Sequence, residues 1–269
     1  MGRPYHYFKY HESREESFTN IAHRGASAYY PENTLAAFEA AIELGADMIE
    51  FDVQLSKCGE VVVFHDEKLS RCTDGRGRLS DHHLHELKKL DAGCWFGNKF
   101  KGATIPTLHE ALGLCRDKIA VNIEIKTEAV TDMATGGIEE KCLKIVEQSG
   151  MKNHIVFSSF DPRAIKHLRE IDNNVAVAVL YKEKYYDNIL PAQIVNLFNA
   201  DCFNCSHKEL KAQWLENLKK HNISVNVYTV DDEKKMIGFL KAGVEGIFTN
   251  KPDVLKKTAD DFFRATTNV

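Results

Sequence analysis

Residues 47–53 of the chain read Asp-Met-Ile-Glu-Phe-Asp-Val, a strand pattern that carries acidic residues on one face. Because side chains two residues apart share a face of a β-strand, Glu50 and Asp52 point one way and Phe51 points the other. The apolar face has to pack against helices, so the two carboxylates face inward. This arrangement fits a closed barrel of parallel strands, in which functional groups lie near the carboxyl ends of the strands.

A second strand pattern, residues 119–126, repeats the arrangement, with Asn122, Glu124 and Lys126 on one face. For one such strand, an ion pair between Glu124 and Lys126 is the simpler explanation. Two polar inward strands favour a bound cation instead, because buried carboxylates without partners are costly. Carboxylate ligands without His or Cys favour one hard divalent ion, Mg²⁺ or Ca²⁺. The residues expected to bind it are Glu50, Asp52 and Glu124.

Short runs rich in β-branched residues alternate with stretches of helical periodicity, which is typical of a parallel sheet with crossover helices. The runs expected to form strands are residues 20–23, 47–53, 61–64, 119–126, 154–158, 174–181, 201–205, 223–229 and 246–249. The helices are expected at residues 34–44, 107–116, 138–149, 162–171, 191–199, 207–221, 232–242 and 253–265.

Nine strands are one more than a (β/α)8 barrel needs. Residues 61–64 follow the strand at 47–53 after a short turn that contains glycine, so these two can form a hairpin. The other eight strands can then close the barrel. The predicted fold class is therefore α/β, a (β/α)8 TIM barrel with a lid insertion after the second strand.

The lid is expected at residues 66–106, a connection far longer than the others, with only a short helical patch. Connections of this length are commonly functional caps or lids. We expect a single domain over residues 1–269 in which Trp95, Phe96 and Phe100 of this cap set the reach of the substrate pocket.

The composition excludes several classes of function. The 269 residues include 35 basic and 39 acidic side chains, a net charge of −4, so no nucleic-acid partner is expected. No segment approaches the ~18 apolar residues of a transmembrane span, and residues 1–17 lack the apolar core of a signal peptide. Seven scattered cysteines fit free thiols in a reducing compartment, so the expected location is cytoplasmic. The oligomeric state stays open.

Two histidines follow predicted strands and are candidates for proton transfer. His23 and Arg24 end the first strand, and Gly25 allows a sharp exit of the backbone there. A histidine and an arginine at such a point can supply a proton-transfer group and a bidentate clamp for an anion. His65 closes the strand at 61–64, and the adjacent Asp66 can orient its imidazole.

Together, these segments resemble the glycerophosphodiester phosphodiesterases, a family of phosphatidylinositol-phospholipase-C-like barrels. The resemblance rests on Ala-His-Arg-Gly-Ala-Ser at 22–27 with Pro-Glu-Asn-Thr at 31–34, Glu-Phe-Asp-Val at 50–53, His-Asp at 65–66 and Glu-Ile-Lys at 124–126. It covers nearly the whole chain, insertion included. The order and spacing of these motifs are far more specific than any one of them.

The resemblance implies a role for each residue: metal binding by Glu50, Asp52 and Glu124, proton transfer by His23 as base and His65 as acid, and phosphate binding by Arg24 and Lys126. It also implies a glycerophosphodiester substrate, hydrolysed to sn-glycerol 3-phosphate and an alcohol through a cyclic 1,2-phosphate. Two positions depart from the family pattern. Tyr228, which stands where members commonly have Trp, is expected to keep an aromatic wall at the substrate, and His109 is expected to be a surface residue.

Other functions stay open on the sequence alone. An apolar groove under the cap aromatics would admit lysophospholipids for lysophospholipase D-type cleavage. From a different class, a phosphate-binding aldolase would use Lys126 as a Schiff-base amine, although neighbouring carboxylates keep such a lysine protonated. A non-catalytic phosphate-binding barrel would have no need of two separately placed histidines.

Overall fold

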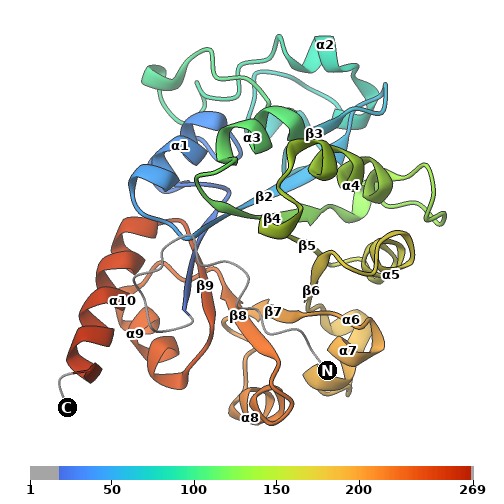
Figure 1. Ribbon diagram of the computed structural model, residues 1–269. Helices are drawn as coiled ribbons and strands as arrows, with labels where there is room; N and C mark the ends of the chain where they lie inside the picture. Colours follow the sequence, from blue (N-terminus) through green and yellow to red (C-terminus); the bar gives the residue numbers. More distant parts are fainter. Residues whose placement is uncertain (1–17, 268–269) are drawn as a thin grey trace.

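The computed structural model describes residues 18–267, and within them nine strands form one sheet that closes on itself (Figure 1). The order is β1-β9-β8-β7-β6-β5-β4-β2-β3, and β1 also pairs with β2. The strands are β1 (Thr19–His23), β2 (Met48–Leu55), β3 (Val61–Val63), β4 (Ala120–Ile125), β5 (Ile155–Ser159), β6 (Ala176–Leu180), β7 (Cys202–Ser206), β8 (Ser224–Tyr228) and β9 (Gly246–Thr249).

All nine predicted strands are present, and their pairing confirms the predicted topology. β3 runs antiparallel to β2, with Val63 opposite Val53, whereas every other pairing in the sheet is parallel. Eight parallel strands therefore close a (β/α)8 TIM barrel, and β3 is the hairpin partner of its second strand.

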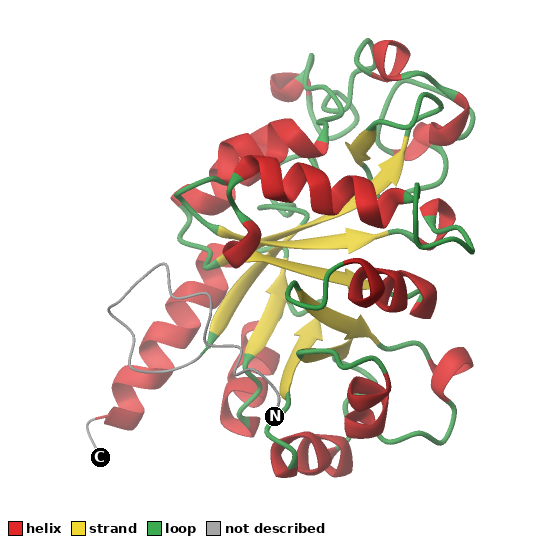
Figure 2. Ribbon diagram, turned by 45° about the vertical axis from the view of Figure 1, so that its right-hand side comes forward, coloured by secondary structure: helices red, strands yellow, loops and turns green. Residues whose placement is uncertain are grey.

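Helices surround the barrel, and the strands are enclosed by them in Figure 2. They are α1 (Leu35–Glu43), α2 (Leu84–Leu87), α3 (Leu108–Cys115), α4 (Ile138–Ser149), α5 (Pro162–Ile171), α6 (Glu183–Tyr186), α7 (Pro191–Leu197), α8 (Ala212–Lys220), α9 (Glu233–Ala242) and α10 (Pro252–Thr267). Several begin where a side chain accepts a hydrogen bond from an unpaired amide, as Thr107 does from Glu110 at the start of α3. None of the helices in residues 18–267 is long and apolar enough to cross a membrane.

One predicted helix start was wrong, and one short helix was not predicted. The predicted start of α8 at residue 207 fails because the amide of His207 donates to the carbonyl oxygen of Tyr228 (2.8 Å), which holds this residue beside β8. The short helix α6 was missed, since four residues are too few to show a helical period.

The barrel interior changes from apolar to polar along the strands. Its apolar layer contains Ile21, Met48, Ala120, Val156, Ala178, Cys202 and Phe248. Two residues further along β1, β2 and β4, the inward positions are His23, Glu50 and Asn122, which are lateral neighbours in the sheet. The period of two therefore carries polar side chains to the carboxyl ends of the strands, the end at which such barrels hold their functional groups.

Residues 66–106 form an insertion between β3 and α3, with short helical turns at η2 (Leu69–Arg71), η3 (Leu79–Asp81) and η4 (Asn98–Phe100) besides α2. A small core joins the insertion to the hairpin and contains Val62, Phe64, Leu69, Cys72, Leu79, Leu87, Ala92 and Ile105. The ring of Phe100 also packs against Tyr30 of the β1–α1 loop at 5.2 Å. The insertion thus rests on the hairpin and on the loop that leaves β1.

Candidate active site

The exit from β1 is a turn that needs glycine. Arg24 and Gly25 both have a positive φ, +57° and +81°, and a Cβ at Gly25 would lie 2.6 Å from the carbonyl oxygen of Ala37. The turn directs the amide of Arg24 at Glu50, whose Oε2 accepts its hydrogen bond at 3.0 Å. The predicted sharp exit at Gly25 is confirmed, and it places the backbone of β1 against an acidic residue of β2.

The start of α1 divides two tasks between neighbouring residues. Thr34 is the N-cap and accepts a hydrogen bond from the amide of Ala37. Asn33, with φ +58°, turns inward and its Nδ2 donates to Oδ2 of Asp52 at 2.9 Å. The asparagine of the Pro-Glu-Asn-Thr motif therefore orients one of the predicted metal ligands.

The three predicted metal ligands come together as the sequence indicated. Asp52 of β2 pairs directly with Glu124 of β4, and Glu50 lies two residues earlier on the same inward face of β2. One oxygen from each of the three lies within 4.8 Å of the others. Burial raises the pKa of Glu50 well above its usual value, and the negative charges of Asp52 and Glu124 raise it further. Burial likewise raises the pKa of Glu124.

Two cations border this cluster of carboxylates. Arg24 Nε lies 3.4 Å from Asp52 Oδ2, and Lys126 Nζ lies 3.3 Å from Asp52 Oδ1 and 2.8 Å from Glu124 Oε1. Burial alone would raise the pKa of Asp52, but the charges of Lys126 and Arg24 outweigh it and hold that pKa well below its usual value. Asp52 is thus ionised. Glu50, by contrast, lies near more negative than positive charge.

These residues fit a hard divalent cation. The donor set consists only of carboxylate oxygens, which Mg²⁺ and Ca²⁺ prefer. Oε1 of Glu50 is buried and accepts no hydrogen bond from any residue in the described range 18–267. Such a buried anionic oxygen is costly unless a positive charge faces it.

His23 is held in one orientation and one tautomer. Its Nδ1 lies 2.8 Å from Oδ1 of Asn250, the residue directly after β9. That oxygen also accepts from Ser27 Oγ at 2.8 Å, while Nδ2 of Asn250 donates to Asp231 at 2.7 Å. Because the Asn250 oxygen can only accept, Nδ1 of His23 carries the hydrogen, and Nε2 keeps the lone pair that a general base needs. The network assigns this tautomer.

Burial and the neighbouring charge of Arg24 lower the pKa of His23 to about 4. His23 is therefore neutral near pH 7, as required of a group that accepts a proton. The free energy of unfolding should depend on this group. Well above pH 6.5 neither state binds the proton, and as the pH falls through 6.5 toward 4 the unfolded state binds it first, so stability declines.

We expect His23 to account for about 2 kcal/mol of lost unfolding free energy at pH 5 relative to pH 7. Urea denaturation with chelator present, for wild type and His23→Gln, measures this difference. His109 is exposed on α3, so His109→Gln is the matched control and should keep the wild-type pH dependence. An identical pH dependence in wild type and His23→Gln would contradict the prediction.

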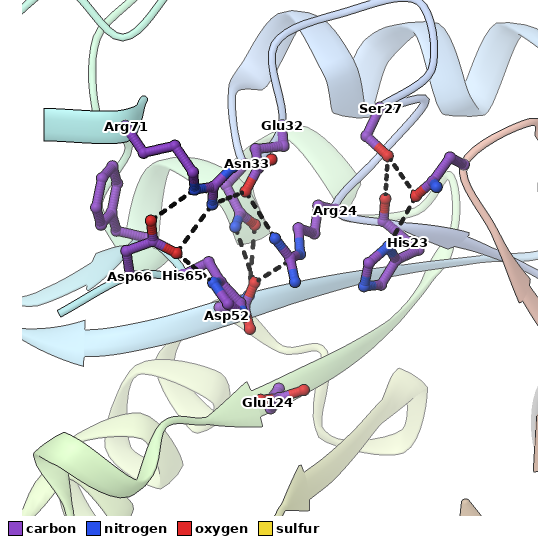
Figure 3. Close-up of polar contacts among 12 residues, drawn as sticks. His23, Arg24, Ser27, Glu32, Asn33, Asp52, His65, Asp66, Arg71 and Glu124 are labelled. Atoms are coloured by element: carbon purple, nitrogen blue, oxygen red, sulfur yellow. Dashed lines mark hydrogen bonds and ion pairs between the residues drawn. The ribbon is translucent and has the colours of Figure 1, made fainter. Parts of the chain in front are cut away.

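His65 is oriented by its neighbour in the sequence. Its Nδ1 lies 2.6 Å from Oδ1 of Asp66. Hydrogen bonds from Arg71 lower the pKa of Asp66 to about 2, so this carboxylate is ionised near pH 7 and can only accept. Nδ1 therefore carries a hydrogen here also, and Asp66 orients the imidazole as the sequence predicted. In Figure 3, His23 and His65 lie on opposite sides of Arg24 and Asp52.

Tyr228 ends β8 and belongs to a group of aromatic rings. It packs edge-on against Phe160, which follows β5, at 6.0 Å and against Phe248 at 6.1 Å. Its hydroxyl donates to the carbonyl oxygen of Tyr181 at 3.4 Å, and burial raises its pKa. Tyr228 therefore lies among aromatic rings, and its hydroxyl is engaged with the backbone.

Sequence reasoning missed several residues of the site. They are Asn33, Asn250, Asp231, Glu32 and Arg71. Asn250 could have been found, because it directly follows the last strand and the carboxyl ends of all strands converge in a barrel. The others act through contacts between distant segments, which residue spacing does not reveal.

The class that the barrel and its site define is that of the TIM-barrel phosphodiesterases. The model of the glycerophosphoryl diester phosphodiesterase family matches residues 23–254. The chain belongs to this family.

Individual proteins agree with this assignment. A glycerophosphodiester phosphodiesterase of Caldanaerobacter subterraneus subsp. tengcongensis is 40% identical over 236 residues, 87% of this chain and 95% of that protein. A phosphodiesterase of Oleispira antarctica, solved with the product sn-glycerol-3-phosphate, matches with TM-score 0.79 and 29% identity over 89% of this chain and 96% of its own. A glycerophosphodiester phosphodiesterase of Agrobacterium tumefaciens matches with TM-score 0.76 and 29% identity over 87% and 97%.

Proposed function

We propose that this protein hydrolyses glycerophosphodiesters to sn-glycerol 3-phosphate and an alcohol, with a divalent cation and two histidines. The observation that carries the proposal is the pair of imidazoles, His23 and His65, each held through Nδ1 and placed on either side of Arg24 and the carboxylates. An acid and a base in fixed positions are what cleavage of a phosphate ester requires when one group must gain a proton and another must lose one.

Glu50, Asp52 and Glu124 would hold one divalent cation, Mg²⁺ or Ca²⁺. Such an ion, when bound, supplies positive charge to the non-bridging oxygens of the phosphate. Arg24 and Lys126 flank the same carboxylates and would hold the phosphate from the protein side, since both present N–H donors to an anion.

The two histidines would divide the proton transfers. Neutral His23 would accept a proton at Nε2 from the attacking hydroxyl. His65 would deliver a proton from Nε2 to the departing alcohol, with Asp66 stabilising the protonated ring.

We also propose that residues 66–106 cap the site within a single catalytic domain and that Tyr228 forms part of the wall for the substrate. The insertion's contacts with the β1–α1 loop support the cap, because that loop carries Arg24 and Glu32. The ring contact between Tyr228 and Phe160 supports the wall, because both residues lie at carboxyl ends of strands.

A second candidate substrate class, the lysophospholipids, is favoured by one observation. Trp95 of the cap is 38% exposed, and edge-on contacts connect it through Phe96 to Phe100. An exposed aromatic series on a cap is a surface that an acyl chain can cover. The aldolase alternative is disfavoured, because Glu124 and Asp52 more than offset burial and raise the pKa of Lys126 above its usual value.

The experiment that tests the proposed function measures release of sn-glycerol 3-phosphate from glycerophosphocholine, glycerophosphoethanolamine and glycerophosphoglycerol. Release of choline is measured from lysophosphatidylcholine, because its cleavage leaves an acylated glycerol phosphate. We expect turnover of at least one deacylated diester and its loss on exhaustive chelation. Preference for lysophosphatidylcholine would instead support the second candidate. Absence of turnover with every substrate, in the presence of Mg²⁺ or Ca²⁺, would contradict the proposal.

Glu50→Gln combined with Asp52→Asn is expected to abolish metal binding measured by calorimetry, because it removes two of three anionic ligands while preserving shape. Activity should fall with it. Glu128→Gln, a change in η5 (Thr127–Ala129) close to Lys126 but outside the carboxylate cluster, is the control and should bind metal as wild type does. A wild-type binding isotherm in the double variant would exclude these residues as the ligands.

A further inference from the structure

Arg71 in the insertion forms a double clamp on two carboxylates. Its Nη1 and Nη2 donate to the two oxygens of Glu32 at 2.9 and 2.7 Å. Its Nε and Nη2 donate to the two oxygens of Asp66 at 2.6 and 2.9 Å. One guanidinium thus binds a residue of the β1–α1 loop and a residue next to β3, which are 34 positions apart in the sequence (66 − 32).

Each of these carboxylates also holds a group of the proposed reaction. Oε1 of Glu32 accepts from Arg24 Nη1 at 2.7 Å, and Oδ1 of Asp66 accepts from His65 Nδ1 at 2.6 Å. The same oxygen atoms, Oε1 and Oδ1, accept from Arg71. Figure 3 shows the resulting chain, with Arg71 between the phosphate-binding side and the proton-transfer side.

The charges along this chain alternate, and its geometry requires an arginine. Two carboxylates would repel one another if Arg71 did not lie between them. Only a guanidinium offers a planar fork of donors that can bind both carboxylates at once, whereas a lysine ammonium is a point charge. The side chain of Arg71 is 45% exposed, so its ion pairs contribute little to global stability. Their effect is on the orientation of the Glu32 and Asp66 carboxylates.

We propose that Arg71 is a positioning residue that fixes Arg24 and His65 relative to each other through Glu32 and Asp66. The inference rests on the proposed function for its effect on turnover, and on the clamp itself for its effect on His65. Because Arg71 belongs to the insertion, docking of the insertion also places Arg24 and His65 relative to each other.

The matched comparison is Arg71→Ala against Lys88→Ala. Lys88, also in the insertion, pairs with Glu110 of α3, so it fastens the insertion to the barrel without contacting either histidine. We expect Arg71→Ala to lower kcat about tenfold or more with unchanged metal affinity, and Lys88→Ala to keep wild-type kcat. Guanidinium at non-denaturing concentration should restore part of the kcat of Arg71→Ala. Arg71→Lys should fall between wild type and Arg71→Ala.

A second readout does not depend on activity. Long-range ¹H–¹⁵N spectra of the histidine side chains report the tautomer of His65, which should be Nδ1–H in wild type and in Lys88→Ala. In Arg71→Ala the free Asp66 carboxylate can rotate, so the His65 signals should shift toward a mixture of tautomers. Glu32→Gln should leave the His65 signals closer to wild type, because Arg71 still binds both oxygens of Asp66.

Failure of the proposed function and failure of the inference about Arg71 give different results. If wild type hydrolyses no phosphodiester, the proposed function fails, and the His65 spectra still decide whether Arg71 positions this ring. If wild type is active and Lys88→Ala loses as much kcat as Arg71→Ala, then Arg71 acts only by attaching the insertion to the barrel. That result would overturn the inference. Unchanged kcat together with unchanged His65 spectra in Arg71→Ala would also overturn it.

Discussion

Replacing His23 by alanine is expected to lower kcat by at least ~10²-fold, and replacing His65 should have an effect of the same size. Under the proposed function, each substitution removes a proton-transfer group that acts in the transition state. Each ring is also held by one hydrogen bond from Nδ1, so its loss leaves the backbone of the site in place. Steady-state kinetics at saturating metal, with unfolding midpoints measured in parallel, test the prediction.

The effects of the two substitutions should not multiply. If the two imidazoles serve one concerted cycle, removing either already forfeits most of what the pair supplies, and the double variant should be little worse than the poorer single variant. His109→Ala, a substitution of an exposed histidine on α3, should keep wild-type kcat. A double variant that lost the full product of the two single losses would show that the histidines act independently.

Two proton-transfer groups would not be sufficient for the proposed reaction. At about 10²–10⁴-fold each, they supply at most roughly 10⁸ together. Hydrolysis of phosphate esters usually needs a larger acceleration, so charge stabilisation has to provide the rest. Arg24 and Lys126 lie where they can contribute it, within 3.4 Å of the carboxylate cluster.

The parts of the site that the sequence predicted are those that depend on local periodicity. Glu50 and Asp52 share a face of one strand, and Glu124 shares a face with Lys126, so a period of two is enough to bring each pair inward. Likewise, His65 and Asp66 are adjacent, and their hydrogen bond needs no knowledge of the tertiary structure. The barrel was predicted from a second local pattern, the alternation of β-branched runs with stretches of helical periodicity, which is typical of parallel strands joined by crossover helices.

The parts that the sequence could not predict depend on contacts between distant segments. Asn250 orients His23 across 227 positions, and Arg71 binds Glu32 across 39. Their positions become meaningful only when the barrel closes and the insertion docks. Asn33 is a different case, since an asparagine beside the start of a helix is expected to be its N-cap. The structure gives that task to Thr34 and turns Asn33 toward Asp52.

The identity of the nucleophile gives a second prediction with a large expected effect. Ser27 lies close to His23 in the chain, but the single hydrogen of its hydroxyl is shared between two acceptors, the carbonyl oxygen of His23 and Oδ1 of Asn250. It is therefore not activated by an imidazole nitrogen, and a covalent enzyme intermediate is poorly supported. The attacking group has to come from the substrate or from solvent. The 2-hydroxyl of the glycerol unit lies beside the phosphate within the same molecule and has the advantage of a high effective molarity.

We therefore expect a 2-deoxy analogue of the substrate to bind and not be cleaved. His23, neutral and with Nε2 available, would take the proton of the 2-hydroxyl, and His65 would protonate the departing alcohol. The bond from the 2-oxygen to phosphorus forms as the bond to the alcohol breaks, which gives a cyclic 1,2-phosphate that water then opens. Competitive inhibition by the 2-deoxy analogue without product release, together with hydrolysis of added cyclic phosphate, would agree with this order. Cleavage of the analogue at near-normal kcat would show instead that water attacks the phosphorus directly.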